Sequence, residues 1–123
     1  MILSVDPSRA LPVYEQVREQ IRRMVAAGTL QPGGRLPTIR QLAADLGLAK
    51  GTIERAYELL ENDAVIERRG RNGTYVAHVT PSTKQEVMRE LETAAESLVI
   101  IARQFGADEE AAIRAVRTSW RRV

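Results

Sequence analysis

The 123-residue chain contains no cysteine, which excludes a disulfide scaffold and a cysteine-ligated zinc finger. His78 is its only histidine, so a metal site would need Asp or Glu for its other ligands, and a lone exposed histidine is the expectation. We expect no metal and no other cofactor. Aromatic residues make up only 4% of the chain, so the core must rest on aliphatic side chains, which favours helices over a β-sandwich.

Long apolar runs and a strong charge bias are missing as well. No segment approaches the ~18 consecutive apolar residues of a membrane helix, and the N-terminus lacks the charged and apolar regions of a signal peptide. We therefore expect a cytoplasmic protein without a membrane partner. Residues 1–79 carry 11 Lys and Arg against 9 Asp and Glu, a net charge of +2, and residues 80–123 carry 7 against 7. Any nucleic-acid binding must then come from individually placed arginines.

Apolar periodicity and end signals predict three helices in the first half of the chain. The first spans about 12–27, where apolar residues recur at steps of three and four. The second, 39–46, begins after Thr38, a good N-cap residue, and stops at Gly47. The third spans about 50–62. Two helices joined by a short turn that contains glycine are typical of a helix-turn-helix.

A β-hairpin is predicted directly after the third helix. The stretches "AVIERR" and "TYVAHV" have the composition of strands, and the glycines of "GRNG" between them allow a tight turn. A hairpin at this place, about 66–78, is the wing of a winged helix-turn-helix. We therefore predict a mainly α fold with a small β-hairpin, in which residues 1–79 form a winged helix-turn-helix domain.

The remaining residues predict an α-helical hairpin. After a linker at about 80–82, helices are expected over 83–105 and 108–122, with apolar residues at steps of three and four. Because one short helix cannot cover this seam, two copies would bury it as a four-helix bundle, so residues 80–123 are predicted to be a dimerisation tail. Docking of the tail onto its own winged domain is the alternative. The predicted dimerisation residues are Val87, Leu91, Ala94, Leu98, Phe105, Val116 and Trp120.

A tail as short as residues 80–123 does not readily enclose a pocket of typical ligand volume. No pocket is therefore evident from the sequence, and a small-molecule effector bound between subunits stays open. The chain also lacks a nucleophile motif and a phosphate-binding loop, so we do not expect an enzyme.

Residues 12–76 resemble the DNA-binding domain of the GntR family of bacterial transcriptional regulators. The resemblance rests on "GTLQPGGRLPTIRQLA", "GTIERAYELL" and "IERRGRNGTYV", which follow one another at the family's spacing. The opening "PVYEQV" and the short two-helix tail resemble the YtrA subfamily in particular. The resemblance implies a homodimer that binds operator DNA of pseudo-palindromic sequence, usually as a repressor.

The predicted DNA contacts fall on the starts of two helices and on the wing. A helix N-terminus favours phosphate, and in a helix-turn-helix the first residues of the second helix reach base edges. Arginines at a wing tip suit a narrow minor groove, although they would also protect an exposed sheet edge. The candidates are Arg35, Thr38 and Arg40; Lys50, Gly51, Thr52 and Arg55; and Arg69, Gly70, Arg71 and Gly73.

The sequence departs from the family at Gly51 and at Glu54, where many members have Arg. Glu54 could accept from cytosine N4, or pair with Arg40 or Arg55. Arg68 is expected to be solvated on the other face of its strand, and Tyr14 and Tyr75 to pack in the core and against the helices.

The alternative function is a winged-helix protein-interaction module without DNA binding. Such a module would expose apolar residues where this chain has its arginines.

Overall fold

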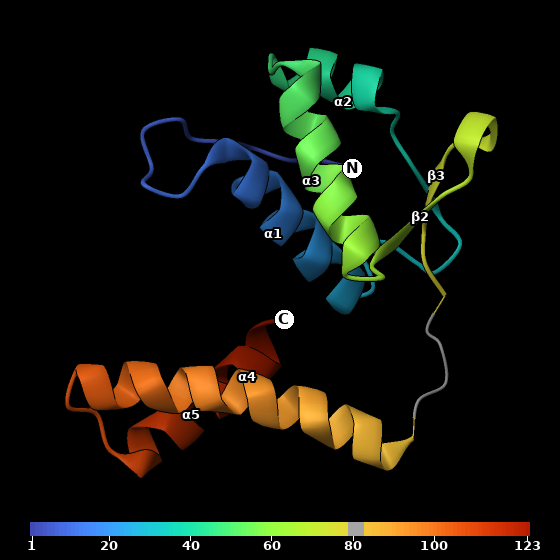
Figure 1. Ribbon diagram of the computed structural model, residues 1–123. Helices are drawn as coiled ribbons and strands as arrows, with labels where there is room; N and C mark the ends of the chain where they lie inside the picture. The colour runs from blue at the N-terminus through green and yellow to red at the C-terminus, as the bar shows by residue number, and fades with distance from the viewer. Residues whose placement is uncertain (79–82) are drawn as a thin grey trace. The chain divides into compact units, whose positions relative to one another are not determined.

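The computed structural model describes residues 1–78 and 83–123, and the chain divides into two compact units, Met1–Val79 and Thr80–Val123. The first unit holds three helices and a small antiparallel sheet (Figure 1). Its helices are α1 (Val13–Ala26), α2 (Ile39–Leu46) and α3 (Lys50–Asn62). Its strands, β1 (Arg35–Leu36), β2 (Ile66–Arg68) and β3 (Thr74–Val76), lie in the order β1-β3-β2. The predicted winged helix-turn-helix fold is therefore confirmed.

Local signals in the sequence set the ends of α2. Thr38 and Gln41 form a capping box: Thr38 Oγ1 accepts from the Gln41 N–H at 3.0 Å, and Gln41 Oε1 accepts from the Thr38 N–H at 3.0 Å. Gly47 ends the helix in the left-handed conformation, with φ of 65°. Three residues then separate α2 from α3, so the predicted helix-turn-helix is formed by these two helices.

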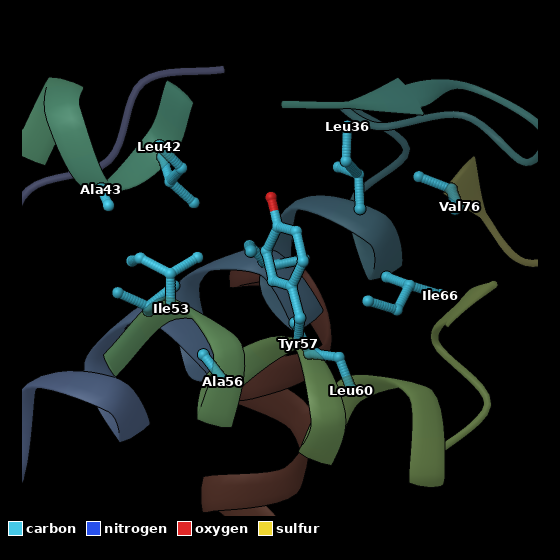
Figure 2. Close-up of a cluster of buried hydrophobic side chains, with 11 residues drawn as sticks. Leu36, Leu42, Ala43, Ile53, Ala56, Tyr57, Leu60, Ile66 and Val76 are labelled. Carbon is cyan, nitrogen blue, oxygen red and sulfur yellow. The ribbon is translucent and has the colours of Figure 1, made fainter. Parts of the chain in front are cut away.

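The core lies where α1, α2, α3 and the sheet meet, and Figure 2 shows Tyr57 of α3 at its centre. The Tyr57 ring is fully buried, and its hydroxyl donates to the Pro37 carbonyl at 2.8 Å. Burial raises the pKa of Tyr57, so the phenol stays protonated as a donor. This bond ties α3 to the segment that leads into α2. The other buried apolar residues are Val17, Ile21, Leu36, Leu42, Ala43, Ile53, Ala56, Leu60, Ile66 and Val76.

The sheet differs from the predicted hairpin in three ways. Strand β1 was not predicted; it pairs with β3, so that Arg35 lies opposite Tyr75. The strands β2 and β3 are shorter than "AVIERR" and "TYVAHV", because regular pairing covers only three residues of each. The tip is a 3-10 turn, η1 (Gly70–Asn72). The expected strand residue 79 and the expected linker at 80–82 lie outside the described residues.

The second unit consists of α4 (Lys84–Gln104) and α5 (Glu109–Arg122), which pack against each other (Figure 1). Each helix begins at a capping side chain: Thr83 Oγ1 accepts from the Glu86 N–H at 3.1 Å, and Asp108 Oδ1 from the Ala111 N–H at 2.9 Å. No residue of either helix is buried. No helix in the described parts of the chain is long and apolar enough to cross a membrane.

A groove of about 530 Å³ runs between the two helices. It arises because the alanines on the facing sides are small and leave space that larger side chains would fill. The groove is open to the surface, since neither helix has a buried residue, so it does not contradict the expectation that the tail encloses no pocket. The lining includes Ala95, Leu98, Ala102, Ala112, Ile113 and Val116.

Candidate nucleic-acid interface

The first turn of α3, helix α2 and the wing tip lie at the same end of the first unit (Figure 1). Three exposed cations belong to these elements: Arg40 in α2, Lys50 at the start of α3 and Arg71 in η1; a fourth, Arg35, lies in β1, which precedes α2 and pairs with the wing strand β3. We call these four residues the basic face. The structure thus places predicted DNA contacts from widely separated parts of the sequence at one end of the domain.

The basic face is distinguished by its lack of internal partners. Within residues 1–78 and 83–123, no ion pair involves any of its four cations, whereas other arginines of the first unit do form ion pairs. Arg9, Arg22 and Arg55 are the other cationic side chains of residues 1–78 without such a pair, and Arg55 contacts the Tyr14 ring instead. Cations without an internal carboxylate partner keep their charge available for an external anion such as phosphate.

Arg35 and the wing are in direct contact. A Cβ built on Gly73 would lie 3.3 Å from both Nε and Nη2 of Arg35, so the guanidinium covers the glycine backbone. Gly73 has φ of 106° and ψ of −168°, a conformation that only glycine adopts readily. The contact joins a predicted phosphate ligand of the α2 region to the base of the wing.

Arg69 and Arg71, which were predicted to act alike, have different surroundings. Arg69 Nη2 donates to Glu67 Oε2 at 3.2 Å, and its guanidinium carbon lies 4.4 Å from the centre of the Tyr75 ring. The Tyr75 hydroxyl donates to the Asn72 carbonyl at 2.7 Å. Tyr75 therefore supports the wing, and the expectation that it packs against the helices was wrong. Arg71 is the wing arginine without an ion pair among the described residues.

The start of α3 is open at the residues predicted to read bases. Its N-cap residue, Ala49, offers no capping side chain, so the first N–H groups of α3 lack the side-chain acceptor that α2 has in Thr38. Gly51 lies inside the helix, and a Cβ built there would meet nothing within 4 Å. A turn requirement therefore does not explain Gly51. Its missing side chain leaves bare backbone on the surface, while Thr52 beside it is half-buried.

Arg55 is held by α1. Its guanidinium carbon lies 4.3 Å from the centre of the Tyr14 ring, and Nη2 donates to the Tyr14 hydroxyl at 3.3 Å. Tyr14 is half-buried at the edge of the core, so the predicted core position is only partly correct. The stacking restricts Arg55 to the side of α3 that faces α1.

Glu54 and Arg68 form a pair that the sequence reasoning missed. Arg68 Nη1 donates to Glu54 Oε1 at 2.7 Å, and Nη2 donates to the Glu54 carbonyl at 3.3 Å. Arg68 Nε is buried and lies 3.9 Å from Glu61 Oε1. The expected pairing of Glu54 with Arg40 or Arg55 and the expected solvation of Arg68 were both wrong. The available signal was the seven-residue spacing of Glu54 and Glu61, which puts both on one side of α3 beside the strand that follows.

Comparisons with known proteins agree with this architecture. Residues 13–76 match the model of bacterial regulatory proteins of the gntR family. The chain belongs to this family of transcriptional regulators. It is 40% identical over 112 residues to the HTH-type transcriptional regulator Rv1152 of Mycobacterium tuberculosis, covering 91% of this chain and 88% of that one.

Two further similarities bear on the subfamily and the ligand. The chain is 30% identical over 110 residues to the HTH-type transcriptional repressor YtrA of Bacillus subtilis, covering 89% of this chain and 85% of that one, and is a YtrA-like member of the family, as predicted. The solved DNA-binding domain of AraR in complex with operator ORX1 has a TM-score of 0.56 and 29% identity, covering 63% of this chain and 99% of that one.

Proposed function

We propose that the protein is a sequence-specific DNA-binding repressor that acts as a homodimer on a pseudo-palindromic operator. The observation that carries the proposal is the basic face: exposed cations without ion pairs in the described chain, at the ends of two helices and a wing. The operator complex of the AraR domain and the printed repressor role of YtrA support it, each as a statement about that protein.

The residues divide into two roles in this proposal. Arg35, Arg40 and the wing meet phosphates, which position the protein but carry little sequence information. Lys50 and Thr52 lie at the start of α3, where a Lys can bond guanine O6 or N7 and a Thr methyl can contact thymine. The remaining proposed contacts are the Thr38 hydroxyl, Arg55, Arg69 and the glycine backbones of Gly51, Gly70 and Gly73.

The second unit supplies the proposed dimer interface. A helix pair without a buried side chain gains little from packing in a single copy, because burying a large apolar side chain contributes about 1.5–3 kcal/mol. Large apolar side chains of this unit remain exposed, among them Phe105 at 77% and Trp120 at 84% of their surface. A second copy would cover them. The proposed interface comprises Val87, Leu91, Ala94, Leu98, Phe105, Val116 and Trp120, and the proposed functional division is 1–79 for DNA and 80–123 for dimerisation.

The proposed roles are tested by titrating Lys50→Ala and Arg71→Ala against an operator duplex that wild type is expected to bind and against a scrambled duplex. The two duplexes are compared at the same salt concentration, and the titrations are repeated over a series of salt concentrations to obtain the salt slope. Loss of Lys50 should cost roughly 1–3 kcal/mol on the operator and much less on the scrambled duplex. Loss of Arg71 should weaken both duplexes alike and reduce the salt slope by about one, if Arg71 meets phosphate. Wild-type protein that binds neither duplex would contradict the proposal.

A further inference from the structure

We propose that Glu54 is a specificity-determining residue that selects cytosine in each operator half-site, and that Arg68 of the wing is its positioning residue. This inference rests on the proposed DNA binding and adds to it the base that α3 reads. It also accounts for an acidic side chain on a helix that faces a polyanion.

The first observation is the place of Glu54 on α3. It follows Lys50 by four residues, so the two side chains are neighbours one helical turn apart on the same side of the helix. Its side chain is 50% exposed, although it is paired with Arg68. Gly51, three residues before Glu54, presents only backbone with open space around it. The surface beside the carboxylate is thus free for a base edge to approach.

The second observation is the way in which Arg68 holds Glu54. The guanidinium binds the carboxylate at 2.7 Å and the carbonyl of the same residue at 3.3 Å, so it bridges the side chain and the backbone of Glu54. Arg68 is itself partly enclosed, since its side chain is 25% exposed and its Nε is buried, and within the described residues the hydrogen bonds of its guanidinium go only to Glu54. A carboxylate held by a wing residue is preorganised and loses little rotamer freedom on binding.

Arg68 also offsets the negative charge that Glu54 would bring close to DNA. An unpaired glutamate in the major groove would be repelled by the phosphates on both sides of it. A guanidinium at hydrogen-bonding distance offsets most of that charge as seen from a distance. The carboxylate nevertheless keeps capacity to accept, because it has about four lone-pair sites and the bond from Arg68 Nη1 uses one of them.

The chemistry of the major groove then selects the base. An ionised carboxylate only accepts hydrogen bonds, and the amino donors in the major groove are cytosine N4 and adenine N6. Guanine and thymine present acceptors there and would repel it. Adenine carries the N7 acceptor next to its amino group, whereas cytosine presents a donor alone. Cytosine is therefore the base that suits Glu54.

The test is selection of bound sequences from a random DNA pool by full-length wild type, Glu54→Gln, Arg68→Lys and Glu61→Gln. Wild type should enrich cytosine at one position of each half-site. Glu54→Gln should change that preference to adenine, whose N6 and N7 match an amide, with a shift of about tenfold in relative affinity. Arg68→Lys keeps the charge but loses the two-point hold, so discrimination should fall at this position and persist at the others.

Glu61→Gln is the matched control, because it removes the same charge beside the same arginine but lies two turns further along α3. It should leave the selected motif unchanged. Thermal melting of each variant shows whether it folds. If Arg68→Lys does not fold, the result for Glu54→Gln alone decides the question. A wild-type motif that Glu54→Gln leaves unaltered at every position overturns this inference while the proposed function stands. Wild type that enriches no motif overturns both.

Discussion

The guanidinium of Arg35 lies against the backbone of Gly73, where a Cβ would come within 3.3 Å of two of its nitrogens. The contact joins Arg35 of the basic face, in the strand β1 that precedes α2, to the base of the wing. Gly73 is thus constrained twice, by its backbone conformation and by the arginine that covers it.

Gly73→Ala should lower the free energy of unfolding by about 1–3 kcal/mol, because alanine is strained in this region of φ and ψ. It should also displace the Arg35 side chain and weaken DNA binding. Urea denaturation measures the first effect, and titration with duplex DNA measures the second.

Gly47→Ala is the matched control for that substitution, because Gly47 is not among the proposed DNA contacts. Gly47 also has a positive φ, 65°, but a Cβ built there would meet nothing within 4 Å. It should show backbone strain of about 1–2 kcal/mol without displacing Arg35. Equal DNA affinity of the two variants would contradict a role for the contact between Arg35 and Gly73.

Removing the Thr38 side chain should destabilise the start of α2. Thr38→Ala deletes the acceptor of the Gln41 N–H and should cost about 1 kcal/mol. Thr38→Ser keeps the hydroxyl and should retain most of the stability. Chemical denaturation of the three proteins checks this, and an unchanged midpoint for Thr38→Ala would show that the capping box contributes nothing.

Adding a side chain at Gly51 should raise the stability of the fold and weaken its binding to DNA. Gly51→Ala should stabilise the fold by up to about 1 kcal/mol, because glycine within a helix is unfavourable and the added methyl meets no neighbour. The same methyl should weaken DNA binding if the backbone approaches the groove closely there. A variant that is more stable and binds DNA as tightly as wild type would show that the Gly51 backbone is not a DNA contact.

The parts of the fold that local signals specify were predictable. The bounds of α2 follow from Thr38 at one end and Gly47 at the other, and α3 follows from its apolar periodicity. Arginines at the wing tip and at the start of α2 could be selected as candidates because sequence position alone puts them at element ends. Their common location at one end of the domain is what the structure adds (Figure 1).

The parts that depend on distant partners were not predictable. Strand β1 has two residues and exists only because β3, about 40 residues later, pairs with it. The partner of Glu54 is likewise fixed by how the hairpin returns along α3. Strand alternation predicts the face of the hairpin on which Arg68 lies, but it does not predict that Arg68 pairs there with the Glu54 carboxylate.

A charge placed on the exposed apolar side of α4 should abolish dimerisation. Leu91 is 57% exposed, so Leu91→Glu should cost little stability in one copy but would put unpaired charges into a shared interface. Sedimentation velocity should show a monomer at concentrations where wild type is a dimer. Ser97→Glu, which adds the same charge elsewhere on α4, should leave the dimer intact. Dimeric Leu91→Glu would place the interface elsewhere.

Selection of bound duplexes from a random DNA pool by the intact wild-type chain tests the central claim most directly. If two copies present α3 and the wing to DNA, the enriched sequences should contain an inverted repeat. Its half-site centres should be about one helical turn, or a multiple of it, apart. Retention without any enriched motif would show only general attraction of the basic face to phosphate, and it would contradict the assignment of this protein as a sequence-specific regulator.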